Sequence, residues 1–435
     1  MKTTKRIIKL VLVVLLIQIL LPLFSFAGTA EDVATLNTKI KSNAAIVMEA
    51  STGKVIYSKN SDTKLYPAST TKILTAIIAL EECELSEMAT VSSYAITSIP
   101  SGYTNANIQV GESLSVEDLL YALMLASANE AAIILGEHIS GNYEDFIKLM
   151  NEKAIELGCK NTNFTNANGM HDKNHYTTAY DLALIAQYCM KNEEFRKIVS
   201  TTSYTLPATK IYPYNSRTFS NTNSLIIVNK NDVPNNYYYP AAIGIKTGYT
   251  TPAGNCLVSA ANNNGLEFIT VTLGATAQNV RYIDSINLFD FAFDNYSFTK
   301  IKAANNVVTT INIENATNDT KKLDLLVKSD IDVLTNLDNK STTVEPNIHL
   351  NKNLKAPIKA GEVVGTVTYE LDGLSYTTDL LAKNDVIEKS DVIAKIVTQI
   401  LLFAIFILII AGILIRKKFK NDRIKYKRSR HLTQI

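Results

Sequence analysis

The sequence predicts an α/β domain in which one antiparallel sheet packs against a helical lobe, followed by a small all-β domain and a C-terminal transmembrane helix. Strand-like patterns precede and follow a long helical stretch, so we expect one sheet built from both flanking parts. Alternating apolar residues return after residue 300, and an uncharged apolar run lies near the end of the chain. The length of 435 residues is enough for two or three domains.

The first 27 residues are predicted to be a secretory signal peptide. Basic residues precede an apolar run from Leu10 to Leu23, and the small residues Ser25 and Ala27 suit cleavage. An uncleaved N-terminal anchor is the alternative. In both cases the body of the protein is exported.

Residues 28–298 are predicted to form the α/β domain, and they begin with a short helix over residues 33–41. Strand patterns at 44–49 and 54–57, with Gly53 at the turn between them, predict a β-hairpin.

A mostly helical lobe is expected over residues 70–198, with one Ala/Leu-rich helical region at 116–139. Residues 203–240 are rich in Asn and Tyr and look loop-like. Three strands and a closing helix are then expected at 244–249, 256–260, 267–274 and 277–293.

The first motif that carries chemistry is Ser69-Thr70-Thr71-Lys72. Ser69 and Lys72 are three residues apart, so both would lie on one face of a first helical turn. A serine hydroxyl becomes nucleophilic when a neighbour takes its proton, and a lysine with a lowered pKa can do this. The helix N-terminus offers N–H groups for a developing oxyanion. Alone, this motif more often marks a helix cap followed by a solvated lysine.

Two further motifs supply polar groups that such a site needs. Ser127 and Asn129 add a second hydroxyl and an amide. Lys246, Thr247 and Gly248 open a strand-like stretch, and they offer a cation, a hydroxyl and a place where a ligand backbone can approach closely. Taken singly, these motifs would be helix-terminal polar residues and an ordinary strand end.

In this order, the three motifs resemble those of the penicillin-recognising serine enzymes. The chain is most similar to the low-molecular-mass penicillin-binding proteins that act as serine-type D-alanyl-D-alanine carboxypeptidases. The supporting segments are residues 45–50, 168–170, 178–183 and 246–253, and the resemblance is strong over about residues 44–293. It implies the serine β-lactamase and penicillin-binding-protein fold, with an active site where the lobes meet.

The resemblance also implies a reaction. Ser69 would attack the carbonyl between two D-alanines of a peptidoglycan stem peptide, form an acyl-enzyme and release the terminal D-alanine during cell-wall maturation. Lys72 would take the Ser69 proton, and Ser127 would pass a proton to the leaving amine. The backbone N–H groups of Ser69 and Tyr249 would form the oxyanion hole. β-lactam antibiotics are expected to bind covalently as inhibitors.

Substrate-binding roles are implied in the same way. Asn129 would orient the lysine base and bind the substrate amide, while Lys246 and Thr247, next to Gly248, would hold the terminal carboxylate. Ala128 stands where many relatives have glycine, which bears on the deacylation rate and not on the class.

Two alternatives belong to other classes. One is a β-lactamase or D,D-endopeptidase on the same scaffold, and the other is a non-enzymatic wall-binding or sporulation protein. The second β domain, the anchor and the lack of a Glu-x-x-x-Asn segment argue against a class A β-lactamase. A non-enzymatic protein would be expected to have a broken motif, and none of the three motifs is broken.

No cofactor or metal is expected, because His171 and His175 lack a third ligand and lie in a loop-like region.

Cysteine spacing and charge restrict the chemistry further. The cysteines at 83, 159, 189 and 256 have neither metal-ligand nor disulfide-scaffold spacing, so we expect buried thiols, with one disulfide as the alternative. The net charge of +2 includes about +4 in the first 27 residues and +8 in the last twenty, which leaves about −10 for the rest. This acidic body argues against nucleic acid as a partner.

Residues 299–388 predict a small β-sandwich-like domain. The strand-like segments are residues 307–313, 323–327, 365–369 and 374–378, and the last two flank an Asp372-Gly373 turn. Many carboxypeptidases of the resembled family have a comparable C-terminal β domain. It would be a spacer or docking module, or a passive pedestal.

Residues 394–415 are predicted to be a transmembrane helix and residues 416–435 a basic cytoplasmic tail. The apolar run has no charge over about 20 residues, which is about 30 Å of helix. Because positive residues stay in the cytoplasm, we expect a single-pass protein of the cell membrane with its catalytic domain extracytoplasmic. The resembled family commonly has an amphipathic terminal helix instead. Binding of the tail to anionic lipid headgroups is a secondary possibility.

Overall fold

The computed structural model describes residues 30–228, 237–338 and 344–432. The predicted signal peptide therefore lies outside the described residues. The chain divides into two compact units. The first unit consists of the chain up to Phe298 together with the later segment Leu334–Ser341. The second unit consists of Thr299–Val333 and the chain from Thr342 onward.

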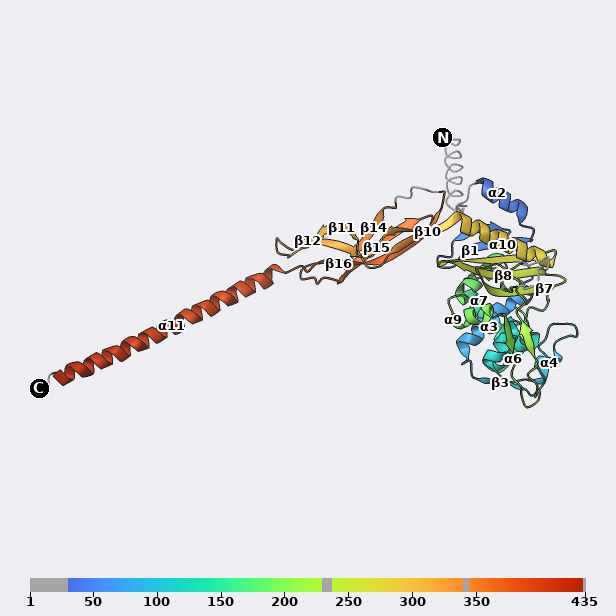
Figure 1. Cartoon of the computed structure of the whole chain (residues 1–435), viewed down its shortest axis with the longest axis horizontal. Coiled ribbons are helices and arrows are strands. Elements are labelled where there is room, and N and C mark those ends of the chain that lie inside the picture. The colour runs from blue at the N-terminus through green and yellow to red at the C-terminus, as the bar shows by residue number, and fades with distance from the viewer. Residues whose placement is uncertain (1–29, 229–236, 339–343, 433–435) are drawn as a thin grey trace, which may run out of the picture. The chain divides into compact units, whose positions relative to one another are not determined.

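A five-stranded sheet forms the centre of the described part of the first unit, in the order β2-β1-β9-β8-β7 (Figure 1). All neighbouring strands are antiparallel. The strands are β1 (Ala44–Glu49), β2 (Val55–Lys59), β7 (Ala242–Thr250), β8 (Gly254–Asn263) and β9 (Leu266–Ala275). Because β1 pairs with β9, the N-terminal and C-terminal parts build one sheet, which confirms the predicted architecture.

Helices cover both faces of this sheet (Figure 1). On one face lie α2 (Ala30–Lys39) and α10 (Gln278–Asn295), and on the other lies the helical lobe. Alternate residues of β1 pack on opposite faces of the sheet. Ala45 and Val47 belong to the apolar cluster that includes α10, whereas Ile46 belongs to the cluster of the helical lobe. This explains why the strand is apolar at nearly every position.

The helical lobe begins with the 3₁₀ turn η1 (Ala68–Thr71), which continues directly into α3. The helices of the lobe are α3 (Lys72–Glu82), α4 (Ser93–Thr97), α5 (Val116–Met124), α6 (Asn129–Ser140), α7 (Tyr143–Glu156), α8 (Ala179–Cys189) and α9 (Glu193–Ser200). A short ladder joins β3 (Met88–Thr90) to β4 (Ser113–Ser115). Helix α3 is buried along most of its length, so it is the central helix of the lobe.

The helical region expected at 116–139 is present but is not continuous, because the chain leaves α5 after Met124 and starts α6 at Asn129. Ser127, between them, has a φ of +59°, which no α-helix can accommodate. The segment at 203–240 is also not wholly loop, since β5 (Ser203–Thr205) pairs with β6 (Thr218–Ser220).

The second unit contains a sheet with the described order β11-β12-β16-β15-β14. Its strands are β11 (Val307–Asn312), β12 (Lys322–Val327), β14 (Pro346–Leu350), β15 (Val363–Leu371) and β16 (Leu374–Ala382), while β10 (Tyr296–Lys302) pairs with β13 (Ile331–Asn336). The predicted hairpin is confirmed: Leu371 pairs with Leu374, and Asp372 and Gly373 both have positive φ, as this tight turn requires. The strands β13 and β14 were not predicted from the sequence.

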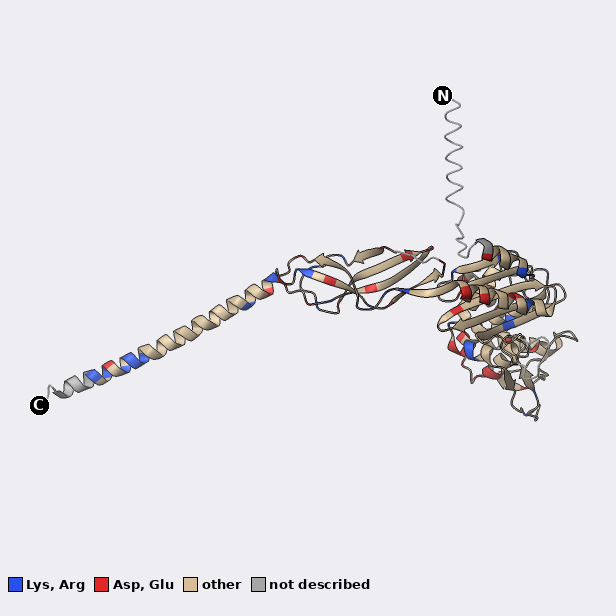
Figure 2. Cartoon of the chain, turned by 45° about the horizontal axis from the view of Figure 1, so that its top comes forward, with Lys and Arg blue, Asp and Glu red and all other residues tan. Residues whose placement is uncertain are grey.

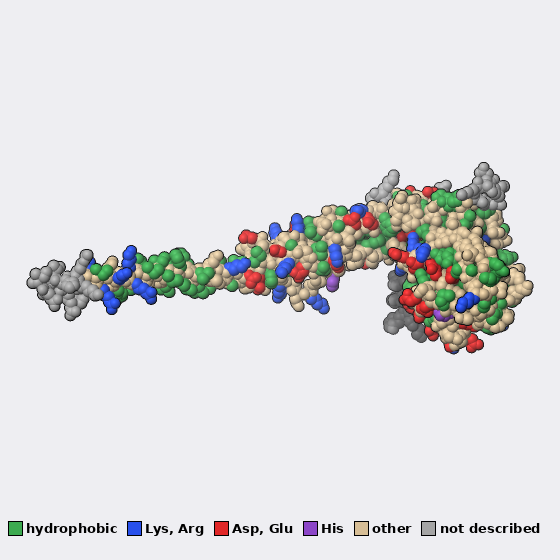
Figure 3. Space-filling model, turned by 60° about the horizontal axis from the view of Figure 1, so that its bottom comes forward, with side chains coloured by type: hydrophobic (Ala, Val, Ile, Leu, Met, Phe, Trp, Pro, Cys, Tyr) green, Lys and Arg blue, Asp and Glu red, His purple; other side chains and the backbone are tan. Residues whose placement is uncertain are grey.

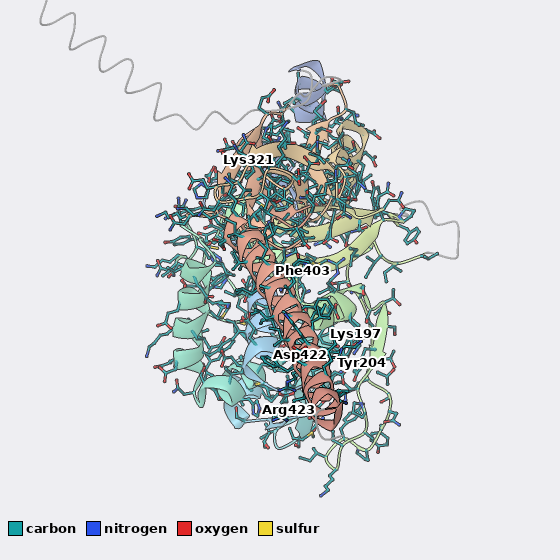
Figure 4. The ribbon with its side chains drawn as sticks, turned by 90° about the vertical axis from the view of Figure 1, so that its left-hand side faces the viewer. Lys197, Tyr204, Lys321, Phe403, Asp422 and Arg423 are labelled. Atoms are coloured by element: carbon teal, nitrogen blue, oxygen red, sulfur yellow. The ribbon has the colours of Figure 1, made fainter. Side chains whose placement is uncertain are left out.

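The last element is α11 (Lys389–Leu432), which is long and apolar enough to cross a membrane. Its middle part carries no Lys, Arg, Asp or Glu, whereas charged residues lie toward both ends (Figure 2). Figure 4 shows Phe403 on this apolar part and Asp422 and Arg423 on the part that follows. Composition and length thus agree with the predicted transmembrane helix.

Candidate active site

Ser69 and Lys72 lie where the 3₁₀ turn passes into α3. Lys72 Nζ is 3.0 Å from Ser69 Oγ, so the two side chains are in hydrogen-bond contact. Ser69 remains partly exposed, whereas Lys72 is completely buried. A ligand in solvent can therefore reach the hydroxyl but not the amine.

Lys72 has two further partners. Its Nζ donates to Asn129 Oδ1 at 2.9 Å and to the backbone oxygen of Asn168 at 2.5 Å. Burial holds the pKa of Lys72 well below its usual value, the positive charge of Lys246 lowers it further, and Glu130 opposes both. The neutral amine needed for proton abstraction is thus favoured.

Asn129 is held from its other side by the chain around Thr104. Its Nδ2 donates to the Thr104 backbone oxygen at 2.8 Å, and its own backbone N–H donates to the same oxygen at 3.2 Å. These bonds fix the amide so that Oδ1 points to the lysine. The sequence placed Asn129 in the site without revealing this contact.

Lys246 lies on β7 and is almost completely buried. Burial lowers its pKa to about 7, with a contribution from the positive charge of Arg281 on α10. Arg281 is itself buried and donates to the backbone oxygen of Gly248 at 3.1 Å. Thr247 Oγ1 lies 2.7 Å from Thr222 Oγ1. This end of the site is therefore cationic and rich in hydroxyl groups.

Strand β7 passes very close to the turn that carries Ser69. A Cβ built on Gly248 would lie 3.0 Å from the oxygen of Pro67 and 3.1 Å from the backbone nitrogen of Ser69. Glycine is required here because backbone approaches backbone. Tyr249 follows with its side chain 60 % exposed.

Ser127 is nearly buried, in its left-handed conformation between α5 and α6. Among the described residues, no hydrogen bond joins Ser127 Oγ to Lys72 or to Lys246. The structure thus joins Ser69, Lys72 and Asn129 by direct hydrogen bonds, whereas Ser127 is near them only because it precedes Asn129 by two residues.

His175 supports the Ser69 turn, a role that sequence reasoning missed. Its Nδ1 accepts from the Thr165 N–H at 3.0 Å, so its Nε2 carries the proton and donates to Thr71 Oγ1 at 2.8 Å. Thr71 in turn donates to the Ala68 oxygen at 2.9 Å. Burial lowers the pKa of His175 to about 4, which keeps the ring neutral. With both nitrogens occupied, this histidine is not available to a metal.

Gly169 packs directly against the same turn. It has a φ of +82°, and a Cβ built there would lie 1.9 Å from the Ala68 oxygen. Ala68 also has a positive φ and is buried. In the sequence, the segment at 168–170 was recognised only as part of the family resemblance, and it gave no direct indication of this packing.

The thiols are all free. Cys159, Cys189 and Cys256 are buried, as expected, but Cys83 is partly exposed. In the described chain, a group of three side chains able to hold a metal occurs away from this site, at Cys83, Glu87 and His138.

Comparison with known proteins identifies the family. A family model described as "D-alanyl-D-alanine carboxypeptidase" matches residues 30–277, and one for "Penicillin-binding protein 5, C-terminal domain" matches residues 296–389. The carboxypeptidase DacF of Bacillus subtilis is 31% identical, covering 88% of this chain and 94% of that protein. DacC of Escherichia coli is 30% identical over 81% of this chain and 86% of that protein.

Solved structures agree with this assignment. Penicillin-binding protein 5 of Haemophilus influenzae is 28% identical with a TM-score of 0.61, covering 80% of this chain and 98% of that one. Penicillin-binding protein 3 of Streptococcus pneumoniae is 25% identical with a TM-score of 0.67, covering 80% and 99%. With its fold, its motifs and both domain matches in agreement, the chain belongs to the D-alanyl-D-alanine carboxypeptidase family of low-molecular-mass penicillin-binding proteins.

Proposed function

We propose that this protein is a serine-type D-alanyl-D-alanine carboxypeptidase, which removes the terminal D-alanine of peptidoglycan stem peptides and is acylated by penicillins. The observation that carries the proposal is the contact between Ser69 Oγ and a fully buried Lys72 whose pKa is lowered. A serine next to a neutral amine has the base that nucleophilic catalysis requires.

The hydrogen bonds of Lys72 also set the direction of proton transfer. A neutral amine has two N–H groups and one lone pair. Asn129 Oδ1 and the Asn168 carbonyl can only accept, so they take the two N–H groups. The lone pair is then left for the Ser69 hydroxyl, which is the arrangement of a general base.

Acylation follows from this arrangement. Lys72 takes the proton as Ser69 Oγ attacks the carbonyl carbon between the two D-alanines. The backbone N–H groups of Ser69 and Tyr249 stabilise the oxyanion. Ser127, with Lys246, delivers a proton to the leaving amine of D-alanine. Water then hydrolyses the ester and restores Ser69.

The cationic end of the site accounts for cleavage at a chain terminus. Lys246 and the hydroxyl of Thr247 bind the free carboxylate of the terminal D-alanine, since charge-assisted hydrogen bonds are the strong ones. The buried Arg281, whose terminal nitrogens donate to the Gly248 oxygen and the Tyr282 hydroxyl, adds positive charge behind them. Burial lowers the pKa of Lys246 to about 7, so the charge that Lys246 offers to the carboxylate decreases above that pH. A substrate without this carboxylate loses the interaction, which separates this activity from that of an endopeptidase.

For location, we propose that α11 anchors the protein in the cell membrane with the catalytic unit outside and the C-terminus in the cytoplasm. The uncharged middle of the helix and the cations that follow it support this orientation. A protease added to intact cells should degrade the catalytic unit and spare the tail. A protected catalytic unit would refute the orientation.

The decisive experiment is labelling of the purified protein with a fluorescent penicillin, followed over time beside a Ser69→Ala variant. Covalent label on the parent alone, decaying slowly, together with release of D-alanine from a stem peptide, is the expected result. Label on neither protein would favour a non-enzymatic wall-binding role. Label lost within seconds would favour a β-lactamase.

A further inference from the structure

We propose that Cys83, Glu87 and His138 form a binding site for one Zn²⁺ ion at the far end of the helical lobe, separate from the active site. The three possible ligand atoms, one from each side chain, all lie within 4.8 Å of one another. Cys83 caps the end of α3, Glu87 lies four residues later in the loop that follows, and His138 comes from α6, 51 residues after Glu87. The fold therefore brings the histidine to a pair of side chains that is close in sequence.

The distances are close to those of a zinc site. Zn–S bonds of about 2.3 Å and Zn–N or Zn–O bonds of about 2.0–2.2 Å in a tetrahedron place ligand atoms roughly 3.5 Å apart. His138 Nε2 already lies 3.1 Å from Glu87 Oε2. Movements of the side chains by about 1 Å suffice to complete the geometry. A water molecule would fill the fourth position.

The side chains are oriented and accessible. Glu87 Oε1 accepts from the Glu84 backbone N–H at 2.6 Å, which leaves Oε2 facing His138. Such support from surrounding groups is a regular feature of metal ligands. Cys83 and His138 are partly exposed and Glu87 is exposed, so an ion can enter from solvent.

The local charge favours a cation. Cys83 caps the C-terminus of α3, and His138 lies in the last turn of α6. Both helices direct the negative ends of their dipoles toward the site. Glu82 and Glu84 lie beside Cys83 in the sequence and are exposed. Figure 3 shows acidic side chains gathered on one face of the first unit.

The donor set selects the metal. One sulfur, one imidazole nitrogen and one carboxylate oxygen suit Zn²⁺, whereas Ca²⁺ and Mg²⁺ prefer oxygen ligands alone. Binding replaces the thiol proton of Cys83, which passes to solvent, and leaves a zinc thiolate; no oxidation or reduction takes place. Without metal, burial and the nearby carboxylates of Glu87 and Glu82 raise the pKa of the Cys83 thiol to about 11.

The position of the site suggests what the metal does. α3 begins with Lys72 and α6 begins with Asn129, and these two side chains are hydrogen-bonded to each other. The metal would join the opposite ends of the same two helices, which pack together in the lobe. We therefore assign it a structural role: it fixes the spacing of the helices that carry the base and its partner.

Zinc binding is tested on the full-length protein in detergent, stripped of metal by a chelator and kept reduced with a phosphine. We expect one Zn²⁺ per chain after gel filtration, and a rise of about 5 °C in the unfolding midpoint at 100-fold excess of free zinc over the dissociation constant. Binding of Co²⁺ should produce a thiolate charge-transfer band in the near ultraviolet.

Variants locate the ion. Cys83→Ser should abolish the thiolate band, and His138→Gln should weaken zinc binding at least 10-fold. His349→Gln is the matched control, because His349 is exposed on β14 of the other unit, and it should bind as the parent does.

Three outcomes would overturn the proposal. These are no zinc bound by the parent, unchanged affinity in the folded His138→Gln variant, or a thiolate band that persists in Cys83→Ser. Penicillin labelling is measured in parallel, so a failure of this proposal is not confused with a failure of the proposed activity.

Discussion

Replacement of Gly169 by alanine tests whether the position of the Ser69 turn limits the reaction. The added Cβ would lie 1.9 Å from the Ala68 oxygen, whereas real Cβ contacts under 3.0 Å are essentially never seen. The turn or the Gly169 loop must therefore shift by about 1.1 Å. A displacement of about 1 Å in a reacting group can cost about 100-fold in rate.

Gly265→Ala provides a matched control. Gly265 has a φ of +89°, comparable to the +82° of Gly169, but a Cβ there would meet no atom within 4 Å. Both variants should lose about 1 kcal/mol of stability from the unfavourable backbone conformation. Only Gly169→Ala combines this penalty with a steric clash at the nucleophile.

The assay is the second-order rate constant of acylation by a fluorescent penicillin, together with the thermal unfolding midpoint. We expect about a 100-fold loss for Gly169→Ala and the parental rate for Gly265→Ala. A folded Gly169→Ala protein that acylates at the parental rate would refute the reasoning. Equal losses in both variants would also refute it, because the backbone penalty alone would then explain the effect.

Three further predictions follow from the site. Lys72→Ala should reduce acylation at least 100-fold while the protein still folds, and an unchanged rate would remove Lys72 as the base. Thr247→Val should weaken turnover of carboxylate-bearing substrates about 10-fold, and equal loss on an amidated substrate would contradict the carboxylate role. His175 has a folded pKa of about 4 and an ordinary value of 6.5, so below pH 6.5 the unfolded chain binds a proton that the folded chain does not. The contribution of His175 to the free energy of unfolding is therefore complete above pH 6.5 and falls by about 3 kcal/mol as the pH drops to 4. Urea unfolding of the His175→Gln variant should lack this pH-dependent loss. Identical pH profiles for the parent and the variant would contradict the prediction.

The sequence predicted most of the fold because its elements carry local signals. The hairpin of β1 and β2 and the turn at Asp372 and Gly373 combine strand patterns with turn residues, and both formed as expected. The break at Ser127 carries no such signal, because Leu125, Ala126 and Ala128 favour a helix. Contacts such as the bond from the Ala128 N–H to the Ala122 oxygen outweigh that local preference.

The site was predictable where motifs carry it, and not where packing does. Lys72 and Lys246 were found from their neighbours in sequence. Arg281 and His175 were not, because they reach the site from α10 and from the chain before α8, and no spacing connects them to Ser69. Side chains that act by changing the pKa or the position of another residue leave a signal only once the tertiary structure is known.

The contact between Ser69 and Lys72 depends on a feature that the motif alone does not specify. In an α-helix, residues three apart are offset by about 60° around the axis, because each residue turns the chain by 100°. In a 3₁₀ turn they are eclipsed. Ser69 lies in η1 and Lys72 directly follows it, so the tighter turn directs both side chains the same way. Thr71 holds the 3₁₀ turn through the Ala68 oxygen and is itself bound by His175, so this buried support helps to align the nucleophile with its base.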